Sequence, residues 1–345
     1  MVEAFGTYVM DVKVDETLAA GTARAREEAK RAAAEKAGVY LESYSKTINL
    51  ELAVDEVKTV AARLLKIQEE SNSVTVVENS LLKFTVNIKA VVDELNEADL
   101  KAMMSDKQAL EDLARKNKEL QEKYDELNRQ MEQYRRDFDT ANDAQKLEIK
   151  KDVKRNSEKF SAVDELAKGN DFAFRKDYSQ ALVAYTNAIN LDSTLAEAYN
   201  NRGIVNYELG KYSEALADYS KAINLKSNYA DAYNNRGNVN AALNQFQNAE
   251  KDLKAALKIN PNSAVIHNNL GSVFLSLKNI DEAIDEYSRA IEINPRYADA
   301  RFNRAAAYYI KGNIVQSFLD ITEARNLNPA DKAIIDLYEK LSKKY

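Results

Sequence analysis

Apolar, small and helix-ending residues recur along residues 162–331 with a period of 34, without insertion or deletion. In each period the eighth, twentieth and twenty-seventh places are small, the twenty-fourth is large, and the thirty-second is serine or proline. Small residues let two helices approach closely, a large residue fills the space between helix pairs, and proline ends a helix. The pattern predicts five helix–turn–helix units, at 162–195, 196–229, 230–263, 264–297 and 298–331.

Such units bury their apolar faces against one another, so a stack of them forms one core and a concave wall. The last residues, 332–345, place Ile334, Leu337 and Leu341 at helical spacing among charged residues. They predict a helix that caps the final unit.

Residues 1–95 follow a different pattern, in which strand and helix periods alternate. Strands are predicted at 8–14 and 39–52, helices at 15–37 and 54–67, and a hairpin of 74–76 and 82–92 around a polar turn at 78–80. The order β-α-β-α-β-β predicts a small α+β domain with helices on one face of a sheet.

Residues 96–160 predict a helical connector with a heptad repeat from Met103 to Ala141. One core position holds Met103, Leu110, Asn117, Tyr124, Met131 and Phe138, and the other holds Leu113, Leu120, Leu127, Tyr134 and Ala141. Two interpretations stay open. The seam of 103–141 pairs two chains in a parallel homodimeric coiled coil, with Asn117 fixing the register, or the helix breaks at 139–143 and 144–160 folds back as a hairpin.

The 34-residue pattern resembles the tetratricopeptide repeat, TPR, over 161–331. The resemblance implies an all-α superhelix with a groove that binds proteins or peptides. The chain is therefore expected to be multidomain: an α+β domain, a long helical connector, and a TPR superhelix.

The N-terminal region carries a second resemblance. An alanine-rich helix at 23–36 leads through Ala37-Gly38-Val39 into a strand, and a V-x-I-x-A-x-V strand follows at 86–92. This arrangement resembles the N-terminal domain of flagellar assembly protein T and related bacterial envelope lipoproteins. The resemblance implies an exported bacterial protein, periplasmic or in the cell envelope, with an assembly role; a cytoplasmic location is the alternative.

Composition narrows the classes of partner. The net charge is −6 and the pI is near 5.3, whereas nucleic acids require a basic surface. We expect no nucleic-acid partner. The absence of cysteine excludes disulfides and thiolate metal sites, and no apolar stretch approaches the roughly 18 residues of a transmembrane segment.

Catalytic chemistry is not indicated. The only histidine, His267, stands at the fourth place of its repeat, where Tyr199 and Tyr233 stand in earlier repeats. That place predicts a packed, structural side chain. Acidic neighbours such as Asp281 and Glu282 fit a solvated helix face better than an acid–base pair. We expect no enzyme, cofactor or metal site.

Asparagine rows carry the functional signal. The sixth place of four repeats is asparagine, and a second asparagine precedes it in three of them. Carboxamides in a row along a TPR groove can bind both the N–H and the C=O of an extended peptide, as in the similar asparagine ladder of O-linked N-acetylglucosamine transferase. The predicted peptide-binding residues are Asn170, Asn201, Asn235, Asn269 and Asn303, with Asn200, Asn234 and Asn268 beside them.

These patterns together predict a non-enzymatic scaffold whose TPR groove holds an extended segment of a partner, in bacterial cell-envelope assembly. Two alternatives stay open. In one, the asparagines only solvate the groove. In the other, the protein is a structural oligomer held by the connector and by packing between repeats.

Overall fold

The computed structural model describes residues 2–12, 29, 32–35, 65–77, 81–92 and 107–342. The chain divides into two units, one formed by Met1–Arg175 with Val183–Ser193 and the other by Lys176–Leu182 with Thr194–Tyr345. No helix in these described stretches combines the length and the apolar character of a membrane span.

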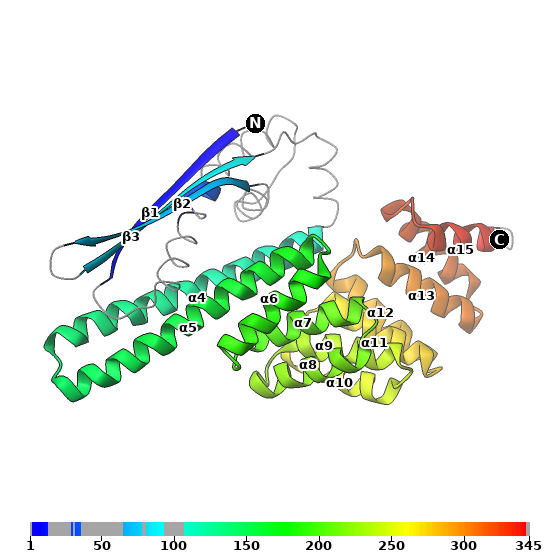
Figure 1. Ribbon diagram of the computed structural model, residues 1–345. Coiled ribbons are helices and arrows are strands. Elements are labelled where there is room, and N and C mark those ends of the chain that lie inside the picture. Colours follow the sequence, from blue (N-terminus) through cyan, green and yellow to red (C-terminus); the bar gives the residue numbers. More distant parts are fainter. Residues whose placement is uncertain are drawn as a thin grey trace. The chain divides into compact units, whose positions relative to one another are not determined.

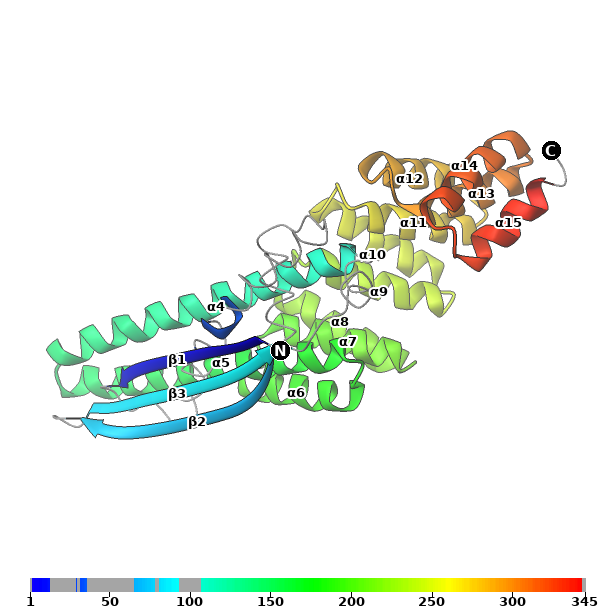
Figure 2. The same ribbon diagram turned by 90° about the horizontal axis from the view of Figure 1, so that it is seen from above.

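The first unit contains a three-stranded antiparallel sheet with the order β1-β3-β2 (Figure 2). Its strands are β1 (Val2–Val12), β2 (Leu65–Val77) and β3 (Leu81–Val92). The strands β1 and β3 overlap the segments whose alternation predicts strands, and β2 and β3 pair around the predicted turn.

The start of β2 departs from the sequence-based prediction, because the helix expected at 54–67 would include Leu65, Lys66 and Ile67. These residues instead pair with Val92, Val91 and Ala90 of β3. A register shift between Ile67 and Glu69 lets the apolar positions before and after it oppose the apolar positions of β3. Pairing with β3 therefore decides the conformation of these three residues, although their sequence pattern has a helical period.

The α+β domain as a whole remains a prediction. Within the helix predicted at 15–37, only residues 29 and 32–35 are described, and they are helical with Ala29 and Ala33 buried. The strand predicted at 39–52 and residues 54–64 lie outside the described residues.

Two long helices follow the sheet in sequence: α4 (Lys107–Thr140) and α5 (Asp143–Phe174). They lie side by side in Figures 1 and 2 and pack against each other. Asn142 caps α5 by accepting from the backbone N–H of Gln145, whose side chain accepts from the backbone N–H of Asn142. This capping box makes the break between the helices.

The predicted seam of the connector lies inside this hairpin. Leu120, Tyr124, Leu127 and Met131 are buried, the ring of Tyr124 lies 5.9 Å from that of Phe160, and the Asn156 side chain donates to the Leu127 carbonyl. The hairpin interpretation therefore holds, and from Leu120 to Met131 the seam proposed for a homodimer through 103–141 is covered by α5 of the same chain. Residues 103–106 and the side chains of Leu110, Leu113 and Asn117 lie outside the described part.

The repeat array begins within α5, which continues through the boundary predicted between the connector and the first repeat at 160–161. The second helix of that repeat is α6 (Tyr178–Leu191). The later repeats are pairs of helices: α7 (Ala196–Glu208) with α8 (Tyr212–Leu225), α9 (Ala230–Ala242) with α10 (Phe246–Ile259), α11 (Ala264–Ser276) with α12 (Ile280–Ile293), and α13 (Ala298–Lys311) with α14 (Ile314–Leu327). From α7 onward, each first helix packs on its own second helix and on a neighbouring repeat (Figure 1).

The core of the array has the predicted composition. The small residues at the twentieth and twenty-seventh places are buried throughout. Glycine at the eighth place lies under the large residue at the twenty-fourth, for example Gly271 under Tyr287. The last repeat is covered by α15 (Lys332–Ser342), whose Ile334 and Leu341 are buried in one cluster with Ile321. This helix lies within the segment 332–345 that the sequence predicts as a capping helix.

Candidate functional site: the asparagine rows and their supports

The asparagines of neighbouring repeats bond to one another along the first helices. The sixth-place amide of one repeat donates from its Nδ2 to the Oδ1 of the fifth-place asparagine in the preceding repeat. The three bonds are Asn235 to Asn200 at 3.1 Å, Asn269 to Asn234 at 2.9 Å, and Asn303 to Asn268 at 2.9 Å. We call these three bonds the asparagine ladder.

Exposure differs among the asparagines, and the ladder acceptor Asn234 is half-buried. Asn200, Asn201 and Asn268 are only 2, 6 and 8% exposed. These three side chains therefore offer little surface to a ligand. In contrast, Asn235, Asn269 and Asn303 are half-buried donors. An amide carries two N–H donors and an oxygen with two acceptor sites, so one ladder bond uses only one of its donors.

The ends of the rows differ from the middle. Asn170 accepts a hydrogen bond of 3.0 Å from the hydroxyl of Tyr185. Burial raises the pKa of Tyr185, so this hydroxyl stays protonated and can donate. Asn170 thus supports the packing of the first repeat. Asn201 accepts from Asn200 at 3.1 Å. At the other end Phe302 takes the fifth place and packs into the cluster under the capping helix, so it offers no amide to extend the ladder.

Arginine–aspartate pairs join the first helix of a repeat to the second helix of the same repeat. The sequence-based predictions did not include these pairs. The arginine at the seventh place forms a two-pronged ion pair with the aspartate at the twenty-third, as in Arg236 with Asp252 at 2.9 and 2.7 Å. Equivalent pairs join Arg202 to Asp218 and Arg304 to Asp320. The hydrogen bonds to Asp252 raise the pKa of Arg236. The sequence signal was available as an Arg and an Asp 16 residues apart in three repeats.

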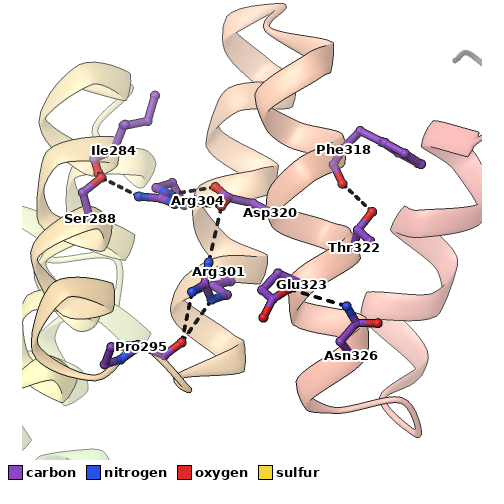
Figure 3. A network of polar contacts seen from close by, with 10 residues as sticks. All are labelled: Ile284, Ser288, Pro295, Arg301, Arg304, Phe318, Asp320, Thr322, Glu323 and Asn326. Atoms are coloured by element: carbon purple, nitrogen blue, oxygen red, sulfur yellow. Dashed lines mark hydrogen bonds and ion pairs between the residues drawn. The ribbon is translucent and has the colours of Figure 1, made fainter.

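These arginines also join neighbouring repeats. Arg236 donates from Nη1 to Ser220 at 3.1 Å. Arg304 donates from Nη1 to Ser288 at 2.9 Å (Figure 3). Each serine lies on the second helix of the preceding repeat. A planar guanidinium that is fixed on two sides sets the spacing between repeats. The first helices of the third and fifth repeats, with Asn235 and Asn303 on them, are therefore held in register with the repeats before them.

His267 and the acidic residues of α12, the other side chains considered for catalysis, make packing contacts or lie exposed on the helix. His267 is buried, and its ring nitrogens lie 2.5 Å from Glu286 Oε2 and 3.1 Å from the Pro261 carbonyl oxygen. Asp281, Glu282 and Asp285 are exposed on α12. Among the residues that the structure describes, no group of three His, Asp or Glu side chains could hold a metal ion.

Comparisons with known proteins agree with the repeat architecture. A family model described as "TPR repeat" matches residues 169–210, 205–244 and 271–312, and one described as "Tetratricopeptide repeat" matches 230–263. No curated protein matches the chain significantly.

Several solved structures are similar to this chain. The structure of PilF from Pseudomonas aeruginosa has a TM-score of 0.51 and 20% identity, and the match covers 54% of this chain and 85% of PilF. YrrB, described as a TPR protein with an unusual peptide-binding site, has a TM-score of 0.44 and 25% identity, with coverage of 53 and 92%. A structure of MamA has a TM-score of 0.44 and 24% identity, with coverage of 49 and 92%. The two family models show that the chain carries tetratricopeptide repeats, within the array expected at 162–331.

Proposed function

We propose that the chain is a non-enzymatic scaffold whose repeats bind an extended segment of a partner protein beside the asparagine ladder. The observation that carries this proposal is the ladder itself. It places the half-buried amides of Asn235, Asn269 and Asn303 in consecutive repeats, each fixed by a bond that leaves a second N–H and an oxygen acceptor site.

The repetition of the amides favours a main-chain ligand. Each rung repeats the same donor and acceptor set on the next first helix, and an extended peptide repeats its own N–H and C=O groups along its length. Side chains of the ligand are not read by such contacts. The proposed partner is therefore an extended or unstructured segment whose main chain supplies most of the hydrogen bonds.

Preorganisation supports binding over simple solvation. A long polar side chain that is free in solution loses rotamer entropy when it binds a ligand. The ladder bonds have already fixed these asparagines. The pairs Arg236–Asp252 and Arg304–Asp320 also fix the helices that carry Asn235 and Asn303. The segment that binds then bears most of the ordering cost.

The chain offers a matched control for the experiment. Asn235→Ala and Asn200→Ala both remove the same ladder bond, but Asn200 is buried whereas Asn235 is half-buried. The pair Asn303→Ala and Asn268→Ala has the same property. Asn200→Ala also removes the bond from Asn200 to Asn201, so the stability loss should be larger for the buried residue than for the half-buried one. Any difference in ligand affinity then belongs to the half-buried amide.

The test uses a displayed library of random unstructured peptides, selected on the full-length protein. Affinities of the recovered peptides are measured by fluorescence anisotropy for wild type and the four variants. We expect Asn235→Ala and Asn303→Ala to weaken binding by about tenfold, the effect of losing one or two hydrogen bonds, and their partners to change it by less than about threefold. Equal effects within each pair would assign the asparagines to packing alone.

We also propose that the protein acts in the cell envelope. The support for this location is the resemblance of the N-terminal region to envelope proteins. Fractionation of cells that express the full-length gene tests it, with the periplasmic or membrane fraction as the expected location. Recovery in the cytoplasmic fraction would remove the envelope from the proposal and leave the binding face untouched. The oligomer alternative is not favoured, because α5 covers the seam it needs.

A further inference from the structure

The single histidine is surrounded by hydrogen-bond acceptors. Its Nε2 lies 3.1 Å from the Pro261 carbonyl oxygen and its Nδ1 lies 2.5 Å from Glu286 Oε2. A carbonyl oxygen only accepts, and an ionised carboxylate only accepts. A neutral imidazole has one N–H and satisfies one of them. Only the imidazolium donates to both.

The last repeat shows which kind of group belongs at this place. Arg301 occupies the fourth place there, as His267 does in the repeat before it. Arg301 donates from Nε and Nη2 to the Pro295 carbonyl at 3.2 and 3.0 Å, and its Nη1 lies 4.0 Å from Asp320 Oδ1 (Figure 3). The two acceptors are equivalent in both repeats: the proline at the thirty-second place and the acid at the twenty-third. His267 thus takes the position of a cation.

In three other repeats an arginine at the seventh place pairs with the acid at the twenty-third place, and the fourth repeat lacks this arginine. Its seventh place is Leu270, where the second, third and fifth repeats have arginine. Glu286 is 16% exposed and His267 is 7% exposed, so little water compensates this carboxylate. The imidazole replaces a permanent guanidinium as the partner of the acid.

Charged side chains on the helices around His267 have partners of their own or lie exposed. On α10, Lys254 pairs with Glu250 at 2.6 Å and lies over the ring of Phe274. On α9, Arg236 pairs with Asp252 of α10. On α13, Arg304 binds Asp320 of α14 and Ser288 of α12, and Arg301 binds Pro295. The remaining acids of α12, which are Asp281, Glu282, Asp285 and Glu292, are exposed.

We propose that His267 is held as an imidazolium that joins the third repeat to the fourth, and that loss of its proton loosens this junction. Pro261 belongs to the third repeat, and His267 and Glu286 belong to the fourth. The ladder bond from Asn269 to Asn234 crosses the same junction. The junctions held by Arg236 and Arg304 do not titrate near neutral pH, because guanidinium remains charged.

The direction of the pH effect follows from the two bonds. The folded chain favours the protonated ring, since both N–H groups are used, whereas the unfolded chain leaves the ring in water. The folded state then binds more protons near neutral pH, and stability falls as pH rises. The contribution is present while the ring carries both protons and is lost when one of them leaves.

Nuclear magnetic resonance tests the protonation directly on the untagged, full-length, ¹⁵N-labelled protein. The chain has one histidine, so every imidazole signal belongs to His267. At about pH 7.5 we expect both ring nitrogens to be protonated in the folded protein and the ring to be neutral in the same protein unfolded in urea. A neutral ring with one bare nitrogen in the folded protein would overturn the proposal, because the proton would then sit on Glu286 or nowhere in the pair.

Unfolding experiments test the consequence. The thermal midpoint of the wild type should fall between about pH 6 and pH 9 by several degrees more than that of His267→Arg, which copies the residue at the fourth place of the last repeat. Glu286→Gln should also flatten the dependence, since the amide no longer attracts the imidazolium. A wild-type slope equal to that of both variants would overturn the proposal. The wild-type spectrum decides the protonation state of the ring even if a variant does not fold.

Discussion

A tight glycine–tyrosine contact in the array predicts a large effect for one added methyl group. A Cβ placed on Gly271 would lie 2.7, 2.8 and 3.1 Å from Cε1, Cδ1 and Cζ of Tyr287. Ordinary carbon–carbon contacts lie near 3.5–4.0 Å. The ring has little room to retreat, because Tyr287 is 1% exposed and its hydroxyl donates to Ser272. Gly271→Ala therefore forces α11 and α12 apart.

Two opposing terms set the magnitude. Overpacking a close-packed core costs about 1–3 kcal/mol, and alanine favours a helix interior over glycine by about 1 kcal/mol. The overlap at Gly271 is deep, so we take the upper part of the first range and expect a net loss of about 1–2 kcal/mol. Gly237 provides the control, because its added Cβ would meet Leu253 at 3.0 and 3.3 Å. Gly237→Ala should cost clearly less.

The last repeat supplies the compensating change. There Ala305 occupies the eighth place and Ile321 the twenty-fourth, and both are fully buried. Gly271→Ala combined with Tyr287→Ile reproduces that pair. The second change should cost less in the Gly271→Ala background than in the wild type, with a coupling of at least about 1 kcal/mol in the double-mutant cycle.

Urea unfolding followed by circular dichroism provides the assay, with transition midpoints compared because repeat arrays depart from two-state behaviour. The reasoning fails if Gly271→Ala is as stable as the wild type. It fails equally if Gly237→Ala is the more damaging change, or if the coupling lies within about 0.5 kcal/mol of zero.

Three further predictions concern the supports of the array. Arg236→Ala should lower the free energy of unfolding by about 3–5 kcal/mol in urea titrations, because it leaves the buried Asp252 with only Asn240 as a side-chain donor. Replacing both Arg236 and Asp252 by leucine should recover most of that loss. A double variant that recovers none of it would refute the reasoning. Asn142→Ala should lower the stability of the hairpin by about 1 kcal/mol in hydrogen exchange, since it removes the cap of α5, and unchanged protection of α5 would argue against the cap. Burial raises the pKa of Tyr287 to about 12, and the folded state favours the neutral phenol, so its stabilising contribution is complete below about pH 10, the ordinary value, and is lost as pH rises towards 12. Absorbance titration of tyrosinate should show one high-pH group fewer in Tyr287→Phe, and identical titrations would contradict the shift.

The sequence predicted most of the repeat architecture because the repeat is a local, periodic unit. Small residues at fixed places and a large residue between them specify how two helices pack. The capping helix followed from the same spacing. These predictions needed only the face of a helix on which each residue lies.

The asparagine rows show where such reasoning ends. The spacing placed the fifth- and sixth-place residues on the first helix, but it did not say that the Asn269 amide reaches back to Asn234 rather than outwards. That choice depends on the distance between neighbouring first helices. The contacts that set such distances join residues on different repeats, as Arg236 and Ser220 do between the second and third repeats.

The connector had a similar limit. A heptad identifies a seam and leaves its partner open. The sequence nevertheless contained the deciding signal, because Asn142 followed three residues later by Gln145 is a capping pair that begins a new helix. In the N-terminal region, a register shift in β2 moved three residues from the predicted helix into a strand. Such shifts depend on the opposing strand and have no local signature.

The side-chain amide spectrum of the folded protein tests the central claim most directly. The protein is titrated with a peptide recovered by selection, and the Asn side-chain NH₂ signals are assigned through the single alanine variants. The proposal predicts that the signals of Asn235, Asn269 and Asn303 shift as the peptide saturates, while those of buried Asn200 and Asn268 move little. Saturable binding that leaves all three half-buried amides unshifted would contradict it.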